Sequence, residues 1–187
     1  MVFISGATGA GKTTLAWHLI RNQGFTALVS VDYLREALRA PSLWPEDKVP
    51  VELRESSYVS ADFLSQSGYL VESIGRVAER MLKKGEIGVI EGVNLVPSQL
   101  SGLLAGPLKD RHLFMLTVDL ESHHRERLST RGKRYLDYAP TITTIGRLLL
   151  ADAEMLIQKA PNLNIVCIDA SGAVTATAQA MRQYFKP

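Results

Sequence analysis

The chain has 187 residues, of which 46% are hydrophobic and 21% are charged, and its net charge is +2. This balance predicts one globular domain, residues 1–187, and gives no sign of a nucleic-acid partner or a membrane surface. The one cysteine, Cys167, excludes an internal disulfide and suits a reducing compartment. We expect its side chain to be a small buried hydrophobe within a strand.

The N-terminal sequence MVFISGATG lacks the basic and long apolar regions of a cleavable signal. No apolar run approaches the roughly 18 residues that a membrane-spanning helix needs. We therefore expect a cytoplasmic protein that does not bind membranes and is either a monomer or a homodimer.

Apolar runs and helical periodicity alternate along the chain. In chain order they predict a strand at 2–5, a helix at 13–20, a strand at 27–31, a helix at 33–38, a helix at about 57–82, strands at 87–92 and 112–118, a helix at 139–158, a strand at 163–168 and a helix at 175–185. Such alternation predicts an α/β fold with a five-stranded parallel sheet covered by helices on both faces. Ligands of such sheets bind beyond the carboxyl ends of the strands, so polar residues there are the candidates for function.

A glycine-rich stretch, GATGAGKT, joins the first strand to the first helix. It fits Gly-x-x-x-x-Gly-Lys-Thr, the phosphate-binding P-loop, in which backbone N–H groups surround the phosphates of a nucleotide. We expect Lys12 to reach the β and γ phosphates and Thr13 to bind Mg²⁺. The predicted nucleotide-binding residues here are Gly6, Ala7, Thr8, Gly9, Ala10, Gly11, Lys12, Thr13 and Thr14.

Carboxylates follow the second and third predicted strands. Asp32 precedes a helix and has Arg35 three residues later, on the same helical face. It is either a catalytic base for an acceptor hydroxyl or the N-cap of that helix. Glu91 ends the run GVIE, where P-loop proteins commonly place a carboxylate that acts on Mg²⁺, although a solvated strand end is the alternative.

A basic segment at 125–134 contains four arginines and one lysine. In a phosphoryl-transfer enzyme such a segment forms a lid, here residues 121–138, whose arginines neutralise charge in the transition state. The alternative is an ordinary solvated helix face. The adjacent His123 and His124 do not have metal-ligand spacing, and we expect both to be exposed.

Several segments together resemble the 2-phosphoglycerate kinase family, P-loop kinases related to the zeta-toxin-like and chloramphenicol-phosphotransferase-like kinases. They are the P-loop, SVDYLREAL, LRESSYV (53–59), VIEGVNLVP (89–97) and KRYLDYAPTITTI (133–145), in the family's order. The chain departs from the family at Arg54 and Asn94, where histidine is usual. Its lid also looks shorter. The departures concern the acceptor side rather than the ATP side.

The resemblance implies a nucleoside-monophosphate-kinase-like P-loop fold, a three-layer sandwich with strand order 2-3-1-4-5. It implies transfer of the γ-phosphate of ATP, with Mg²⁺, to a hydroxyl of 2-phosphoglycerate. A helical region at about 40–82 would cover the acceptor. By analogy with related kinases, Arg131 contacts the transferring phosphate and Arg127 stacks on the adenine, which residues 169–173 also line. With the residues derived above, we expect Lys12, Asp32 and Arg131 to be catalytic and Thr13 and Glu91 to contact the metal. The expected acceptor site contains Arg35, Arg54, Tyr58, Glu91 and Arg134.

Two alternatives remain open from the sequence. One is a kinase of the same fold with another small acceptor, such as an antibiotic, a sugar nucleotide or gluconate. Aromatic residues such as Trp44, Tyr58 and Phe63 could line a pocket for a neutral acceptor. The other alternative is a nucleotide-dependent switch that acts through a partner, although the guanine signature Asn-Lys-x-Asp is absent.

Overall fold

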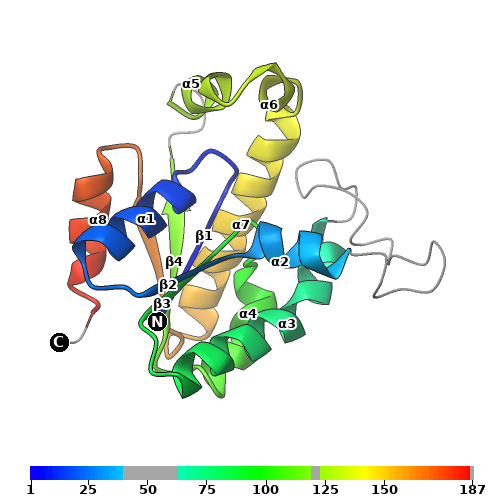
Figure 1. Cartoon of the computed structure of the whole chain (residues 1–187). Helices are drawn as coiled ribbons and strands as arrows, with labels where there is room; N and C mark the ends of the chain where they lie inside the picture. Colours follow the sequence, from blue (N-terminus) through cyan, green and yellow to red (C-terminus); the bar gives the residue numbers. More distant parts are fainter. Residues whose placement is uncertain (40–62, 119–122, 186–187) are drawn as a thin grey trace.

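A five-stranded parallel sheet forms the centre of the molecule (Figure 1). The computed structural model describes residues 1–39, 63–118 and 123–185. The strands are β1 Val2–Gly6, β2 Ala27–Ser30, β3 Gly88–Glu91, β4 His112–Thr117 and β5 Ile165–Asp169. Their order is β2-β3-β1-β4-β5 and every pairing is parallel, as predicted. The apolar runs form buried strands because helices cover both faces of the sheet.

The helices of the described residues cover the sheet on both faces and extend beyond one end of it. They are α1 Lys12–Asn22, α2 Val31–Leu38, α3 Phe63–Lys83, α4 Pro97–Ala105, α5 His123–Thr130, α6 Lys133–Asp137, α7 Ala139–Lys159 and α8 Val174–Arg182. On one face of the sheet lie α1 and α8, and on the other lie α3, α4 and α7 (Figure 1). The predicted three-layer sandwich is confirmed.

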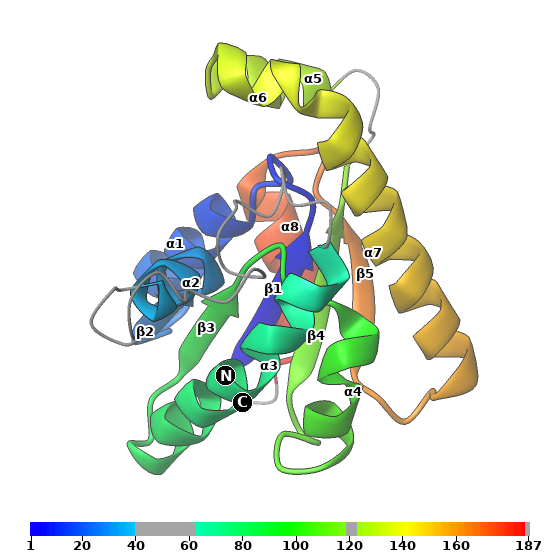
Figure 2. The same ribbon diagram turned by 90° about the vertical axis from the view of Figure 1, so that its right-hand side faces the viewer.

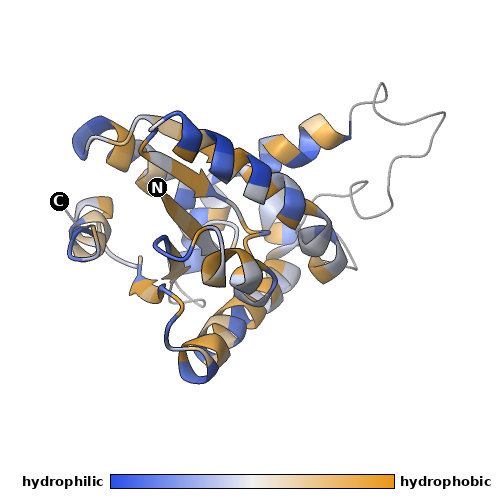
Figure 3. Ribbon diagram, turned by 90° about the horizontal axis from the view of Figure 1, so that it is seen from below, coloured by the Kyte–Doolittle hydropathy of each residue, from blue (hydrophilic) through white to orange (hydrophobic). Residues whose placement is uncertain are grey.

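Each face of the sheet has its own apolar core. The core under α1 and α8 contains Leu15, Leu19 and Met181, and the core under α3, α4 and α7 is larger. Seen from below, the strands are hydrophobic and the helices carry their hydrophilic residues on outward-facing stripes (Figure 3). The period of about 3.6 residues that predicted the helices therefore marks their sheet-facing sides.

Helix α4 was not among the predicted elements. It begins with Pro97 in its first turn, a position that proline tolerates because the missing N–H has no partner inside the helix. Leu100 and Leu104, four residues apart, are buried against the larger core. The nine residues of α4 make only about two and a half helical turns. The apolar periodicity that would have predicted this helix is therefore short.

The expectation for Cys167 was wrong, because its side chain is exposed. It lies in β5, which pairs only with β4 and therefore forms one edge of the sheet. Ile165 and Ile168 of the same strand are buried, whereas Cys167, which lies between them in the sequence, is exposed.

Among the described residues, no helix has both the length and the apolar character needed to cross a membrane.

The carboxyl ends of the strands all point to the same side of the molecule. Helices α5 and α6 lie beyond these ends, above the loop that joins β1 to α1 (Figure 2). Helix α7 runs from α6 down the face of the sheet. This arrangement places the phosphate loop, the ends of β2 and β3, and the predicted lid around one space.

Candidate active site

The phosphate loop joins the end of β1 to the first residue of α1. Gly6, Gly9 and Gly11 all have positive φ angles, which glycine adopts at little cost. Helix α1 begins at Lys12, so the loop lies at the positive end of a helix of 11 residues. The geometry is that of an anion-binding loop, as the sequence predicted.

Lys12 is folded over the loop and is 9% exposed. Its Nζ donates to the carbonyl oxygens of Gly6 and Ala7, both at 2.9 Å. Burial lowers the pKa of Lys12, and the positive charge of Arg131 acts in the same direction, while the Glu91 and Asp32 carboxylates oppose the shift. A phosphate group at this position would offer the buried ammonium a stronger partner than two carbonyl groups.

Glu91 ends β3 as predicted, and it is buried rather than solvated, with 3% of its surface exposed. Thr13 donates through Oγ1 to Glu91 Oε1 at 3.2 Å. Within the described ranges, no three His, Cys, Asp or Glu side chains gather into a metal site. A hydroxyl and a carboxylate are hard oxygen donors, and they fit Mg²⁺, which takes its other ligands from phosphate and water.

The backbone after Glu91 is pressed against the start of α2. A Cβ atom on Gly92 would lie 2.7 Å from the Cβ of Val31, closer than real side chains approach. Val31 is the first residue of α2 and is fully buried. Glycine therefore fits at position 92, next to the paired strand ends Ser30 and Glu91, where a larger residue would force the backbone or Val31 to shift.

Asp32 occupies the first turn of α2 and is not its N-cap, because the cap position belongs to Ser30. The predicted second strand ends one residue earlier than expected, so the helix already includes Asp32. Its carboxylate is 56% exposed and lies 3.7 Å from Arg35 Nη1. The capping alternative is thereby excluded, and Asp32 is free of a backbone role at the helix terminus.

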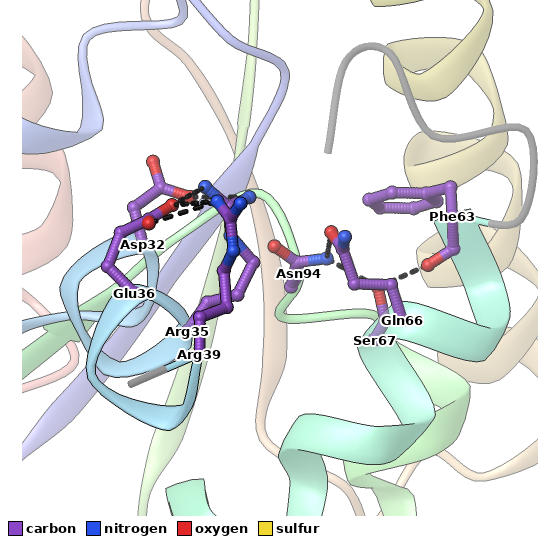
Figure 4. A network of polar contacts seen from close by, with 8 residues as sticks. All are labelled: Asp32, Arg35, Glu36, Arg39, Phe63, Gln66, Ser67 and Asn94. Atoms are coloured by element: carbon purple, nitrogen blue, oxygen red, sulfur yellow. Dashed lines mark hydrogen bonds and ion pairs between the residues drawn. The ribbon is translucent and has the colours of Figure 1, made fainter. Parts of the chain in front are cut away.

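Arg35 is buried, with 6% of its side chain exposed, and its Nη2 donates to Glu36 Oε1 at 2.9 Å. Arg39 binds the same carboxylate from a more exposed position (Figure 4). Burial alone would raise the pKa of Glu36, but the hydrogen bond from Arg35 and the charges of both arginines outweigh it and lower that pKa. The Arg35–Glu36 ion pair is therefore buried on the arginine side and half-exposed on the glutamate side.

One small cavity, of about 80 Å³, brings most of the predicted catalytic groups together. The lining residues include Thr8, Gly9, Lys12, Thr13, Asp32, Arg35, Glu91, Arg131 and Tyr135. Cations and carboxylates thus face one another next to the phosphate loop. Of the predicted acceptor residues, Arg54 and Tyr58 lie outside the described residues, and so does the side chain of Arg134 in α6. Residues 40–62 of the predicted helical region 40–82 also lie outside them.

A larger cavity, of about 400 Å³, lies on the other side of the phosphate loop. Its walls come from the loop, from α5 and from the segment after β5, including Ala170 and Gly172. Arg127 of α5 lines it and donates to the carbonyl oxygens of Ala170 at 2.7 Å and Ser171 at 3.2 Å. The cavity is large enough for a nucleoside, and the assignment of Arg127 and residues 169–173 to the adenine stays a prediction.

Arg131 lies between the two cavities and lines both of them. Its guanidinium lies 5.8 Å from the centre of the Tyr135 ring in α6, and the residue is exposed.

Replacing Arg131 by alanine should lower the maximal rate of phosphoryl transfer by about 10²-fold or more and should change ATP affinity much less. The reason is that we expect its contact with the transferring phosphate to form as charge develops in the transition state. Steady-state kinetics with varied ATP measures both quantities.

The exposed Arg125 of α5, the helix that ends just before Arg131, provides the matched control, since it does not line either cavity. Arg125→Ala should behave like the wild type. An unchanged maximal rate in Arg131→Ala would mean that the basic segment is an ordinary solvated face.

A buried polar cluster, which the sequence did not predict, lies near the acceptor side of the site. Asn94, 1% exposed, donates to Gln66 Oε1 and to Ser67 Oγ, both at 3.0 Å, and Ser67 donates to the carbonyl of Phe63 (Figure 4). The cluster joins the loop after β3 to the first turn of α3. Gln66 and Ser67 are polar residues on the buried face of that helix, and this is the signal that could have identified them.

The expectation that His124 is exposed was wrong, because only 1% of its surface is exposed. It packs against the phosphate loop from α5, four residues before Leu128, which is also buried. Leu128 is the single apolar residue of that helix, so its position marked the buried side. The side chain of His123 lies outside the described residues.

The parallel sheet of order β2-β3-β1-β4-β5, the phosphate loop and the carboxylates beyond β2 and β3 define a P-loop domain of the kinase type. The family model described as AAA domain matches residues 1–144, and the chain belongs to this family. The resemblance to 2-phosphoglycerate kinase noted in the sequence is confirmed by the curated relatives that bear this name.

Curated relatives and a solved structure support this assignment. The chain is 31% identical over 180 residues to 2-phosphoglycerate kinase from Methanopyrus kandleri, a match that covers 82% of this chain and 53% of the relative. It is 31% identical to mevalonate-3-phosphate 5-kinase from Thermoplasma acidophilum, with 70% and 67% covered. A gluconokinase from Sinorhizobium meliloti shares the fold, with a TM-score of 0.53, 15% identity and 98% and 89% of the chains covered. The chain spans about half the length of the 2-phosphoglycerate kinases that it matches.

Proposed function

We propose that this chain is an ATP-dependent kinase that phosphorylates a hydroxyl of a small anionic metabolite, with 2-phosphoglycerate as the first candidate. The observation that carries the proposal is the small cavity, where Lys12, Arg35 and Arg131 face Asp32 and Glu91 beside the phosphate loop. A base and several cations around so small a space suit a small charged acceptor rather than a macromolecule.

The chemistry follows from the position of each group. The acceptor hydroxyl attacks the γ-phosphorus of ATP, its proton passes to the Asp32 carboxylate, and the bond to the β–γ bridging oxygen breaks to release ADP. Lys12 and Arg131 stabilise the charge that develops on the transferring phosphoryl group. Mg²⁺ held near Thr13 and Glu91 would neutralise charge on the β and γ oxygens.

The charge of the acceptor is inferred from Arg35. A buried guanidinium that reaches the cavity binds carboxylate or phosphate through two parallel hydrogen bonds, which a neutral antibiotic or sugar could not use as well. The names of two relatives, 2-phosphoglycerate kinase and mevalonate-3-phosphate 5-kinase, both denote acceptors that already carry a phosphate and a carboxylate. Both features favour an anionic acceptor over a neutral one.

An acceptor panel tests the proposal. With γ-labelled ATP and Mg²⁺, we expect label on 2-phosphoglycerate in preference to 3-phosphoglycerate, mevalonate 3-phosphate, glycerate, gluconate and chloramphenicol. Arg35→Ala should raise the KM for the acceptor by about 10-fold to 100-fold, because a hydrogen bond to a charged group contributes roughly 1.5–3 kcal/mol.

Arg39→Ala is the matched control for Arg35, because Arg39 binds the same Glu36 carboxylate but does not line the cavity. It should leave the KM for the acceptor unchanged. Efficient labelling of chloramphenicol or gluconate, with the phosphorylated acids inert, would replace the anionic acceptor by a neutral one. ATP hydrolysis that responds only to a macromolecule would instead indicate a nucleotide-dependent switch.

A further inference from the structure

His124 makes a polar contact with the phosphate loop that no step of the transfer reaction uses. Its Nε2 lies within hydrogen-bond distance of the carbonyl oxygen of Thr8, 116 residues away in the sequence. A carbonyl oxygen only accepts hydrogen bonds, so Nε2 must carry a proton and donate it. The contact joins the predicted lid to the phosphate loop.

The Thr8 carbonyl belongs to the central peptide of a tight turn. Ala10 N–H donates to the Ala7 carbonyl at 3.0 Å, so residues 7–10 form a β-turn with Thr8 and Gly9 at its centre. Gly9 has a φ of 88°. This is the value of about +80° that a type II turn has at its third residue, whereas a type I turn has about −90° there.

The two turn types differ by a flip of that central peptide. In a planar trans peptide the C=O and N–H bonds point in opposite directions. When the Thr8 carbonyl points to His124, the Gly9 N–H must therefore point away from α5. Thr8 and Gly9 both line the cavity that contains Lys12 and Thr13, on the side where phosphate is expected.

Helix α5 packs tightly on the outer side of this turn. A Cβ atom on Gly9 would lie 3.1 Å from Cδ2 and Nε2 of His124 and 3.1 Å from Cδ2 of Leu128. One helical turn after His124, Arg127 reaches the carbonyl of Ala10 at 3.4 Å. The packing of His124 and Leu128 against Gly9 and the contact of Arg127 with Ala10 thus hold the imidazole at the turn.

We propose that His124 is a positioning residue of the phosphate loop, which holds the Thr8–Gly9 peptide so that the Gly9 N–H is directed at a bound phosphate. This rests on the proposed use of ATP. It also means that α5 supports the loop, with Arg127 within the helix and Arg131 directly after its end.

The test compares nucleotide binding in the wild type, two His124 variants and one control variant. His124→Leu keeps apolar contact but cannot donate, whereas His124→Gln places an amide N–H near the position of Nε2. We expect the affinity for a fluorescent ATP analogue with Mg²⁺ to fall about tenfold in His124→Leu and to return to within about threefold of wild type in His124→Gln. His18→Leu, a change on the surface of α1, should bind like the wild type.

A spectroscopic measurement follows the peptide itself. Thr8–Gly9 is the one Thr–Gly step in the sequence, so ¹³C-carbonyl threonine combined with ¹⁵N-glycine marks a single peptide. Its N–H resonance should shift when the nucleotide binds to wild type and to His124→Gln. In His124→Leu it should already differ in the free protein, because the peptide samples both orientations.

Each outcome decides between a positioning role and simple packing. Equal affinities in all variants, or an equal loss in His124→Leu and His124→Gln, would overturn the proposal and leave His124 as a packing residue. Should His124→Leu fail to fold, His124→Asn, whose amide is one methylene shorter, replaces it as the variant expected to bind weakly. Absence of nucleotide binding in the wild type would remove the proposed function as well, and the two failures are thereby distinguished.

Discussion

Replacing Lys12 by alanine is expected to lower phosphoryl transfer by about 10²-fold to 10³-fold, as the loss of a preorganised donor to a developing charge does in other active sites. Lys12 is buried and contacts only carbonyl groups of its own loop. Because burial lowers the pKa of Lys12, its removal takes away a charge that the folded state disfavours. The melting temperature should therefore stay close to that of the wild type.

Transfer of label from ATP, measured beside a thermal melt, checks this expectation. Lys83→Ala is the matched control, because Lys83 is exposed at the end of α3, where the chain turns toward the first residue of β3 and away from the carboxyl ends of the strands. Unchanged turnover in Lys12→Ala would remove the phosphate loop from the mechanism.

Asp32→Asn should lower turnover by about 10²-fold or more, because the amide cannot accept the proton of the acceptor hydroxyl. The effect on stability should be small. The Asp32 side chain is 56% exposed and its ion pair with Arg35 spans 3.7 Å, so the pair contributes roughly 0–1 kcal/mol. Turnover at saturating ATP and acceptor, together with a denaturant titration, separates the two effects.

Glu36→Gln tests whether any carboxylate beside Arg35 has the same importance. Glu36 binds Arg35 at 2.9 Å, closer than Asp32 does, but it does not line the cavity. We expect at most a few-fold loss of turnover in Glu36→Gln. If Asp32→Asn and Glu36→Gln are equally slow, Asp32 acts only through the position of Arg35 and is not the base.

The framework of the fold could be predicted because its signals are local. Each strand is an apolar run of four to six residues, and the glycines of GATGAGKT occur where strand changes to helix. Strand order followed from the family resemblance rather than from the pattern of residues. The ends of β2 and β3 then placed Asp32 and Glu91 near the loop, because parallel strands end on the same side of a sheet.

The errors concern contacts between distant segments. The burial of His124 depends on a loop 116 residues away, and the exposure of Cys167 depends on β5 being an edge strand. Neither property is visible in the residues next to them. The cluster of Asn94, Gln66 and Ser67 likewise joins two segments, and only the polar residues on the apolar face of α3 hinted at it.

The contact between Val31 and Gly92 has a consequence for exchanging parts between relatives. It leaves no room for a side chain on Gly92, so the backbone that follows Glu91 and the helix that carries Asp32 must have matching shapes. A chimaera that combines this α2 with a β3–α4 loop from another kinase would collide here if that loop placed a side chain at position 92. For recombination, residues 27–38 and 88–96 therefore form one inherited block, although 49 residues separate them in the chain.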